Sequence, residues 1–567
     1  MRTAVFKVLA ILLPLVLLVV VEGFVRLFGT DPFLIPVPGE SEYQTVNPAY
    51  ASRYFRGFVP QVAYNPFLKE KPDSILRIVT LGGSSTAGYP YPFPSGFPER
   101  VAARLRSIEP TRQVEMINLG MTALSSHVLR DITPHVLQMK PDIVLIYAGH
   151  NEYYGAYGAG GPNRSRILTR TLFWFKKSVL FRRFERIISP PNESNRTMMA
   201  QSTTDVAITR DGPVYAAGIE NFEKNLAAIL RSLDRAGIQT YVGTLVSNLR
   251  GQPPLGVNSI ASEAWEHGQQ SWVLGDTTAA MEAFVEAKEY DPIRFRAPEA
   301  MNQVIHRLAM EHGVIQVDTE SFFANQVNDS LFTDHLHPTA FGYGLIAKAF
   351  IGAMEDNVNV HGLDLGAPDP SPLDAAYARL LIARLRLGFP FREGLTEEEE
   401  MRQFEQILEI HRESGSAADS LAALAVTVQL PIYEALLEAR THNLATLDTA
   451  QALAHTRSLL YWQPFNERVH VQAADLASRQ SSNLAGEVMQ LVVARQPSEI
   501  NLNILAALRL RQGAFRAAGI LLHQIESSYP ESPVMLYNMA RYLVLTGDTL
   551  NAEVYFRRYQ RAAQAGR

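Results

Sequence analysis

A loop of small residues that contains two serines is the first stretch of the sequence that could do chemistry. Residues 81–88 read Leu-Gly-Gly-Ser-Ser-Thr-Ala-Gly and follow the apolar, β-branched run 75–80, which predicts a buried strand. Helical spacing begins again at 96–105. Because a helix N-terminus presents free N–H groups and a positive dipole end, a serine there could attack a carbonyl while amides hold the oxyanion. The loop alone is equally typical of a glycine-rich turn.

A second motif of this kind lies at residues 334–338, which read Asp-His-Leu-His-Pro. If the chain turns here, Asp334 could hold one imidazole nitrogen of His337, and the other nitrogen could take a proton from a serine. The same motif could be a metal site with Asp334, His335 and His337 as ligands. It could also be a helix-capping aspartate beside two surface histidines.

Composition limits the function classes that remain. The chain has 567 residues and a net charge of −5, so we expect two to four domains and no general affinity for nucleic acid. It contains no cysteine, which excludes disulfides, thiolate catalysis and zinc–cysteine sites. The absence of cysteine is also compatible with an oxidising compartment.

The amino terminus predicts a membrane anchor over residues 1–29. Two basic residues precede a run from Val8 to Val21 that is apolar and broken only by Pro14. Counted from Thr3, its length is close to the ~20 residues that span a bilayer. No Ala-x-Ala site follows, so we favour an uncleaved anchor over a cleaved signal peptide or a buried helix. Positive charge on the short side places the rest of the chain in the periplasm or at the cell surface.

The middle of the chain predicts an α/β domain, residues 71–360. Before it, residues 30–70 are predicted to form a proline-rich extended stalk that lies along this domain. Apolar runs that end near Gly120, Asn151 and Leu245 alternate with helical spacing up to Met354, which predicts a parallel sheet covered on both faces. Ligands of such sheets bind at the carboxyl ends of the strands, where the serine loop, Gly120 and Asn151 all lie.

Two segments interrupt this alternation. Residues 155–215 form a long excursion with an aromatic and basic stretch at 173–188. We favour an amphipathic helix packed on its own domain, and a lid or a helix on a membrane surface is the alternative. The second segment, about residues 262–292, is a predicted helical-pair insertion.

The C-terminal residues 370–567 predict an all-α repeat domain. Gly513 and Gly547 are 34 residues apart, and alanines lie at the same offsets around each of them. This period resembles that of tetratricopeptide repeats, in which small residues let antiparallel helices approach closely. The helical-pair insertion fits the same template, and a generic helical bundle is the alternative. Either architecture offers a surface for a protein partner rather than chemistry.

Four blocks together resemble those of the SGNH, or GDSL-type, serine hydrolases, and they occur in the order typical of that family. Residues 82–86 correspond to its Gly-Asp-Ser-Leu-Thr block, 118–120 to its glycine block, 149–152 to its asparagine block and 334–338 to its Asp-x-x-His block. The resemblance covers about residues 71–355. One departure is Gly83, which stands where the family has aspartate. That aspartate is not a member of the triad, so the chemistry is little affected.

The resemblance implies a role for each matching residue. Ser84 is the expected nucleophile, His337 the base and Asp334 the residue that orients it. The Ser84 and Gly120 backbone N–H groups and the Asn151 side chain are the expected oxyanion hole. Ser85 is an alternative nucleophile. We interpret His150, His335 and Glu152 as structural or substrate-contacting residues.

The resemblance also implies the fold and the activity. We expect a flavodoxin-like parallel-sheet SGNH domain that acts as a serine esterase or O-acyltransferase through an acyl-serine. Metals and organic cofactors are not required. The expected partners are an ester substrate, such as an acylated carbohydrate or lipid, a protein bound to the helical repeats, and the membrane through the N-terminal helix. The alternative is a catalytically inactive scaffold whose repeats bind a protein.

Overall fold

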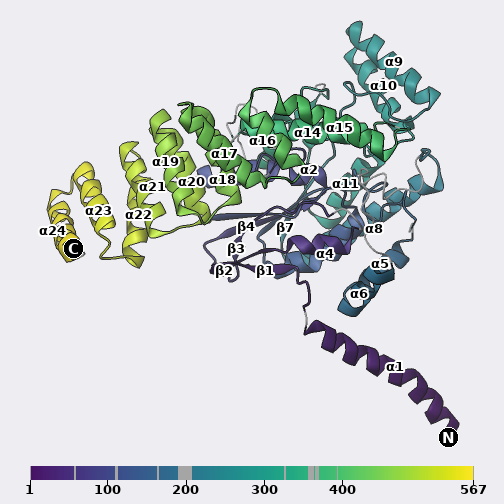
Figure 1. Cartoon of the computed structure of the whole chain (residues 1–567), viewed down its shortest axis with the longest axis horizontal. Coiled ribbons are helices and arrows are strands. Elements are labelled where there is room, and N and C mark those ends of the chain that lie inside the picture. Colours follow the sequence, from purple (N-terminus) through teal and green to yellow (C-terminus); the bar gives the residue numbers. More distant parts are fainter. Residues whose placement is uncertain are drawn as a thin grey trace.

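A five-stranded parallel sheet lies in the middle of the structure with helices packed around it, and the C-terminal helices extend to one side (Figure 1). This arrangement comes from a computed structural model. Side chains of residues 2–12, 15, 495 and 565 are not part of the description. The structure describes residues 2–27, 29–55, 59–92, 94–108, 113–162, 165–188, 207–324, 327–355, 363, 365, 369–392 and 394–565.

The strand order of this sheet confirms the flavodoxin-like expectation. The order is β5-β4-β6-β7-β8, which is the 2-1-3-4-5 order of flavodoxin-like folds when the strands are counted within the sheet. All four pairings are parallel, and the central strand residues are fully buried, so the continuous apolar runs in the sequence are core. The strands are β4 (Leu76–Gly82), β5 (Val114–Asn118), β6 (Ile143–Tyr147), β7 (Gln239–Gly243) and β8 (Ile315–Val317).

Helices cover the sheet in two groups. In the first group α3 contacts α13, and in the second α8 contacts both α4 and α11. Two short helices, α2 and α12, follow strand ends directly. The helices of the domain are α2 (Ser84–Ala87), α3 (Phe97–Ile108), α4 (Ser126–Gln138), α8 (Pro213–Arg235), α11 (Glu299–His312), α12 (Thr319–Phe323) and α13 (Ala340–Met354).

The segment predicted as an extended stalk, residues 30–70, lies against the α/β domain as expected, but it has secondary structure of its own. It forms an antiparallel sheet of β1 (Leu34–Val37), β2 (Glu40–Val46) and β3 (Phe67–Leu68), with a 3₁₀ helix, η1 (Pro48–Arg53). The reason is that apolar residues lie between its prolines. Phe33, Tyr50 and Phe67 are buried in the main core. Removing their apolar surface from water stabilises the packed form of the segment.

The N-terminal helix α1 (Arg2–Arg26) projects away from the rest of the chain (Figure 1). Among the residues whose side chains the structure describes, no helix has both the length and the apolar character needed to cross a membrane. The first half of the predicted anchor lies outside those residues.

Both interruptions of the α/β alternation contain a pair of helices. The first contains α5 (Arg166–Phe175) and α6 (Val179–Ile188). The second is the predicted helical pair, α9 (Ser259–Val273) and α10 (Thr277–Tyr290), which contact each other closely. A Cβ at Gly268 of α9 would lie 2.6 Å from the Phe284 ring of α10, so a small residue is needed here.

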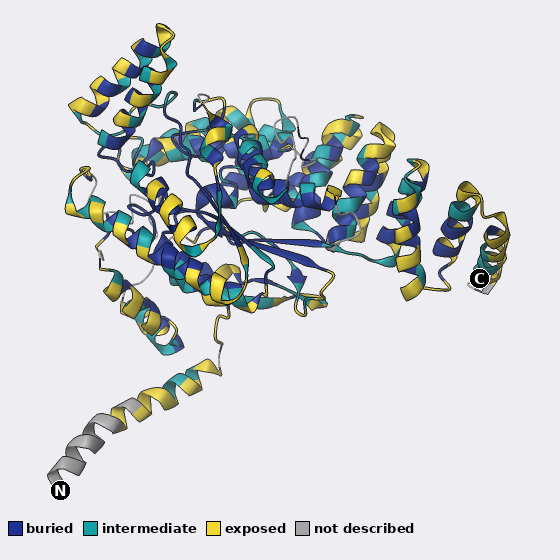
Figure 2. Ribbon diagram, turned by 180° about the vertical axis from the view of Figure 1, so that it is seen from behind, coloured by how far each residue is buried: buried dark blue, intermediate teal, exposed yellow. Residues whose placement is uncertain are grey.

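The C-terminal region is helical throughout its described residues, as predicted, and forms antiparallel pairs. Ala506, Ala518, Ala540 and Ala552 are at most 5% exposed, because they lie where helices meet. Figure 2 shows the buried faces of these helices turned toward their neighbours. The helices are α14 (Pro372–Leu387), α15 (Glu397–Arg412), α16 (Ala417–Val426), α17 (Ile432–Ala445), α18 (Thr449–Trp462), α19 (Glu467–Gln480), α20 (Ser482–Arg495), α21 (Glu499–Arg511), α22 (Phe515–Ser528), α23 (Pro533–Thr546) and α24 (Thr549–Ala565).

The helical region packs directly on the α/β domain. Helix α20 contacts both α3 and β5, and the Gln490 side chain donates a hydrogen bond to the Arg106 carbonyl. Farther along the interface, Arg386 Nη2 donates to the Thr333 carbonyl at 2.8 Å. Residue 333 directly precedes the Asp-x-x-His block, so α14 lies close to it.

A buried ion pair joins the N-terminal sheet to the central sheet. Arg77 of β4 contacts Glu115 of β5, with Nε 2.6 Å from Oε2, and the same guanidinium donates to the Leu68 and Met139 carbonyls. Both side chains are at most 5% exposed. Glu115 Oε1 in turn accepts from the Leu68 N–H at 3.0 Å, so this pair holds β3 in place.

We expect Glu115→Gln to lower the free energy of unfolding by about 3–5 kcal/mol, because it leaves the buried Arg77 charge without a counter-charge. The matched control is Asp475→Asn, which breaks an ion pair with Arg479 in which both side chains are more than half exposed. This control should cost less than about 1 kcal/mol. Urea denaturation of both variants measures the difference. Equal small losses would show that the pair does not hold β3.

Candidate active site

The four predicted blocks lie at the carboxyl edge of the central sheet. Ser84 begins α2 directly after β4, Gly120 follows β5, and Asn151 follows β6. His337 lies in the loop that leads into α13. Parallel strands bring their carboxyl ends to one edge, and segments separated by up to 253 positions therefore meet there.

The side chains of Ser84, His337 and Asp334 form a continuous series of hydrogen bonds. His337 Nε2 lies 2.8 Å from Ser84 Oγ, and His337 Nδ1 lies 2.6 Å from Asp334 Oδ2. The three residues are at most 6% exposed. This is the geometry in which an imidazole can take a proton from a hydroxyl while a carboxylate stabilises the resulting imidazolium.

Local hydrogen bonds position the Asp334 carboxylate. Its Oδ1 accepts from the backbone N–H groups of Leu336 and His337 at 2.9 and 2.8 Å, so the turn predicted for this motif is present. Burial alone would raise the pKa of Asp334. The charge of His337, its hydrogen bond and the two backbone N–H donors outweigh burial, and the pKa is lowered. Asp334 therefore stays ionised beside His337.

The Asn151 side chain lies directly beside the nucleophile loop. A Cβ at Gly83 would be only 2.3 Å from Asn151 Nδ2, so the space that a side chain at 83 would fill is occupied by this amide. The glycine that departs from the family pattern therefore has a physical reason. The Ser84 N–H is in the first turn of α2, where backbone N–H groups have no partner within the helix.

Gly120 has a different environment from the one expected for an oxyanion donor. Its N–H donates to Asn118 Oδ1 at 2.9 Å, and Asn118 Nδ2 donates to the Thr86 carbonyl. A Cβ at Gly120 would lie 2.4 Å from the Ala87 nitrogen. In this structure, Gly120 thus lets two backbone segments approach closely, and its N–H is already bonded.

Comparison with known protein families gives a match over the part of the chain that contains the four blocks. Residues 80–345 match the model of the GDSL-like Lipase/Acylhydrolase family. They form a GDSL-like acylhydrolase domain. As the sequence predicts, the chain contains an SGNH-type serine ester hydrolase. The match begins within β4 and ends within α13, so it includes all four blocks.

Solved structures with a similar chain path include three esterases or lipases. An acetyl xylan esterase, AlAXEase, is 14% identical, with 49% of this chain and 100% of that chain covered and a TM-score of 0.28. An acetylxylan esterase from Geobacillus stearothermophilus is 15% identical, with 51% and 95% covered and a TM-score of 0.28. A protein from Parabacteroides merdae described as a GDSL-like lipase is 14% identical, with 49% and 94% covered and a TM-score of 0.29. No curated protein matches the chain.

Glu152 holds the asparagine loop of the GDSL-like domain against α4. Its carboxylate accepts from the Ser126 N–H at 2.6 Å and from Ser126 Oγ at 2.7 Å. It is 2% exposed, and burial raises its pKa to about 7 although both hydrogen bonds oppose this. Glu152 thus has the structural role that the sequence suggests, and it fixes the position of its neighbour Asn151.

The other histidines near the triad are held in structural contacts. His150 Nδ1 accepts from the Ala297 N–H, and His335 Nε2 lies 2.9 Å from the Pro253 carbonyl. Burial lowers the pKa of each to about 3. His335 is thus bonded to the Pro253 carbonyl and is not a member of the hydrogen-bonded triad. Among the described residues, no three acidic or histidine side chains are grouped to hold a metal ion.

Ser85, the alternative nucleophile, is separate from the hydrogen-bonded chain. Its Oγ is buried and has no hydrogen-bond partner among the described residues. His337 contacts the hydroxyl of Ser84 instead. Of the two adjacent serines, only Ser84 is therefore hydrogen-bonded to the imidazole.

Two aromatic residues that the sequence did not single out surround His337. The Tyr89 ring lies 4.6 Å from the imidazole and the Phe295 ring 6.0 Å. Tyr89 also donates to the Leu381 carbonyl of α14 at 3.3 Å. The short spacing from Ser84 to Tyr89 could have indicated proximity. No local pattern could have indicated Phe295, which is brought in by the chain after α10.

We expect Gly83→Ala to lower kcat for ester hydrolysis about 100-fold with little change in KM, because the new methyl group displaces the Asn151 amide. The matched control is Gly344→Ala, where the nearest atom to an added Cβ is 3.9 Å away. Steady-state kinetics of both variants, together with their melting temperatures, check this. Wild-type kcat in a folded Gly83→Ala protein would exclude Asn151 from catalysis.

We expect the pH dependence of stability to change in Glu152→Gln. The folded protein holds a proton on Glu152 up to about pH 7, whereas the unfolded chain releases it near its ordinary value of 4.5. Wild type should therefore lose up to about 3 kcal/mol of unfolding free energy relative to the variant as pH rises from 4.5 to above 7. Urea denaturation at several pH values measures this difference. A constant difference would contradict a raised pKa.

Proposed function

We propose that the chain is a membrane-anchored serine esterase or O-acyltransferase that works outside the cytoplasm through an acyl-serine intermediate. The observation that carries this proposal is the hydrogen-bonded chain from Asp334 through His337 to Ser84 Oγ. Both hydrogen bonds of this triad are short enough for proton transfer. The three side chains are buried from bulk water.

In the first half of the proposed reaction, Ser84 Oγ attacks the ester carbonyl and its proton passes to His337 Nε2. The Ser84 N–H and Asn151 Nδ2 hold the negative oxygen of the tetrahedral intermediate, each worth about 3 kcal/mol in the transition state. Gly120 adds a third donor only when its N–H leaves Asn118. The intermediate then collapses, His337 returns the proton to the departing alkoxide, and the alcohol leaves.

In the second half, a hydroxyl group attacks the acyl-serine. His337 takes the proton of this hydroxyl and later gives it to Ser84 Oγ, which restores the enzyme. If water attacks, the product is an acid and the enzyme is an esterase. If an acceptor hydroxyl attacks, the acyl group is transferred. The triad geometry serves both reactions equally.

We infer an acylated carbohydrate as the substrate from a pocket beside the triad. It lies next to Ala87 and Gly120, and its walls come from the N-terminal segment, the GDSL-like domain and the helical region. Two of its lining residues, Trp462 and Thr122, each have a buried polar atom, Nε1 and Oγ1, with no hydrogen-bond partner among the described residues. Aromatic faces and unpaired donors suit a sugar ring with hydroxyl groups. The aromatic lining residues are Tyr64, Tyr89, Tyr91, Tyr377 and Trp462.

The location outside the cytoplasm is proposed from the sequence of the first 29 residues, with two basic residues before the apolar run. A single anchor with the catalytic region beyond it fits an enzyme for exported polymers. It also fits a chain without cysteine, which has no thiol to protect from oxidation.

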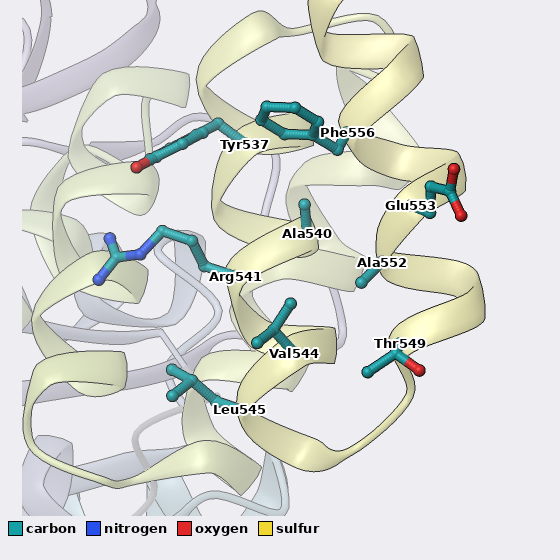
Figure 3. A pocket seen from close by; sticks show the side chains of 9 residues that line it. All are labelled: Tyr537, Ala540, Arg541, Val544, Leu545, Thr549, Ala552, Glu553 and Phe556. Atoms are coloured by element: carbon teal, nitrogen blue, oxygen red, sulfur yellow. The ribbon is translucent and has the colours of Figure 1, made fainter.

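A second function, binding of a protein partner, is favoured by a groove at the end of the helical region. The groove lies between α23 and α24 and is mainly apolar, with Arg541 and Glu553 at its edges (Figure 3). Val544 and Leu545 are about half exposed there. We propose that this tetratricopeptide-like region binds a protein.

We expect Ser84→Ala to lower kcat/KM for p-nitrophenyl acetate by roughly 10³-fold or more, because the nucleophile is removed. The assay uses the full chain in detergent, and the matched control is Ser85→Ala, which should retain activity. A fluorophosphonate probe followed by peptide mapping should label Ser84. Equal turnover by wild type and Ser84→Ala, or labelling of Ser85, would contradict the proposed nucleophile.

A further inference from the structure

Helices α5 and α6 follow each other in the chain, and both carry apolar side chains that are exposed. Two residues of α5, Thr169 and Phe173, are buried against the domain, and Phe173 packs on the rings of Tyr54 and Tyr157. The face of α5 that carries Thr169 and Phe173 therefore packs against the α/β domain. The apolar residues on its other side need a separate explanation.

The exposed apolar residues follow helical spacing in both helices. In α5 they recur at i, i+1, i+7 and i+8, and in α6 at i, i+3 and i+4, so each helix presents one outward apolar face. All seven are between 44% and 79% exposed. These residues, which we call the α5–α6 face, are Ile167, Leu168, Trp174, Phe175, Phe184, Ile187 and Ile188.

The same two helices and their linker are strongly basic, although the whole chain has a net charge of −5. Between residues 166 and 188 there are seven arginines or lysines and one glutamate. Four of the basic side chains, Arg170, Lys177, Arg183 and Arg186, are exposed. Exposed aromatic and aliphatic residues combined with arginine and lysine are typical of helices that lie in a membrane interface.

Hydrogen bonds join the start of α6 to the last turns of α1. The Glu22 carboxylate accepts from the Val179 and Leu180 N–H groups at 3.0 and 2.9 Å and from Ser178 Oγ at 2.7 Å, so it caps the N-terminus of α6. Glu22 is the first residue after the apolar run Val8–Val21. Both views of the molecule show α5 and α6 on the side from which α1 projects (Figures 1 and 2).

We propose that the α5–α6 face binds the surface of an anionic lipid bilayer. The seven apolar side chains enter the boundary between headgroups and acyl chains, and the basic residues contact lipid phosphates. Trp174 and the phenylalanines suit this depth, because aromatic rings concentrate at membrane interfaces. Together with α1, the face fixes the orientation of the GDSL-like domain relative to the bilayer. This inference is independent of the catalytic proposal, because its test does not use ester turnover.

The absence of cysteine from the sequence allows a direct test with single-cysteine variants of the full chain. Ile187→Cys and Leu274→Cys, labelled with a nitrobenzoxadiazole fluorophore, are reconstituted into phosphatidylcholine vesicles with and without phosphatidylglycerol. Leu274, between α9 and α10, is the matched control because it is 83% exposed and lies in a different helical pair. The probe at 187 should shift to the blue and be quenched by brominated lipid, whereas the probe at 274 should keep its aqueous spectrum.

Charge provides a second readout in the same experiment. Adding Arg183→Glu and Arg186→Glu to the Ile187→Cys chain should return the probe toward its aqueous spectrum, most clearly in vesicles with phosphatidylglycerol. Equal aqueous spectra at 187 and 274 in both vesicles would overturn the proposal. So would a blue shift at 187 in lipid-free detergent that grows with protein concentration, because it would assign the face to a second copy of the chain.

Discussion

The contact between Ser84 Oγ and His337 Nε2 depends on how closely backbone segments can approach at the sheet edge. A Cβ at Gly82 would lie 2.2 Å from the Tyr147 carbonyl oxygen, and one at Gly120 would lie 2.4 Å from the Ala87 nitrogen. Any larger residue would push α2 away from its neighbours, and the serine would move with it. The glycines of the predicted blocks therefore act through the space that they leave open.

Much of the fold and the site could be predicted because the signals are local. Continuous apolar runs identify buried parallel strands, and the order of the blocks places them at one sheet edge. The triad residues come from two short segments, 82–86 and 334–338. Hydrogen bonds within the second segment, such as the one from the His337 N–H to the Asp334 carboxylate, form its turn. Local patterns of this kind are contained within a few residues of sequence.

What could not be predicted depends on contacts between distant segments. The prolines of residues 30–70 suggest an extended chain, but Phe33, Tyr50 and Phe67 find a core only because the central sheet offers one. The Gly120 N–H donates to the Asn118 side chain, and the spacing of the two residues in the sequence does not predict this hydrogen bond. The approach of α14 to Tyr89 joins positions almost 300 residues apart. These contacts are consequences of the assembled fold.

The arrangement of the two ends of the GDSL-like domain also bears on the proposed substrate. In Figure 1, helices α14–α16 lie on one side of the central sheet, and α1, α5 and α6 lie on the other. If the α5–α6 face binds the bilayer, the helices α14–α16 are then turned away from it. The helical region contributes Tyr377 and Trp462 to the pocket beside the triad. The two proposals are therefore compatible, because membrane contact by α5 and α6 leaves the helical wall of the pocket free for the proposed carbohydrate ester.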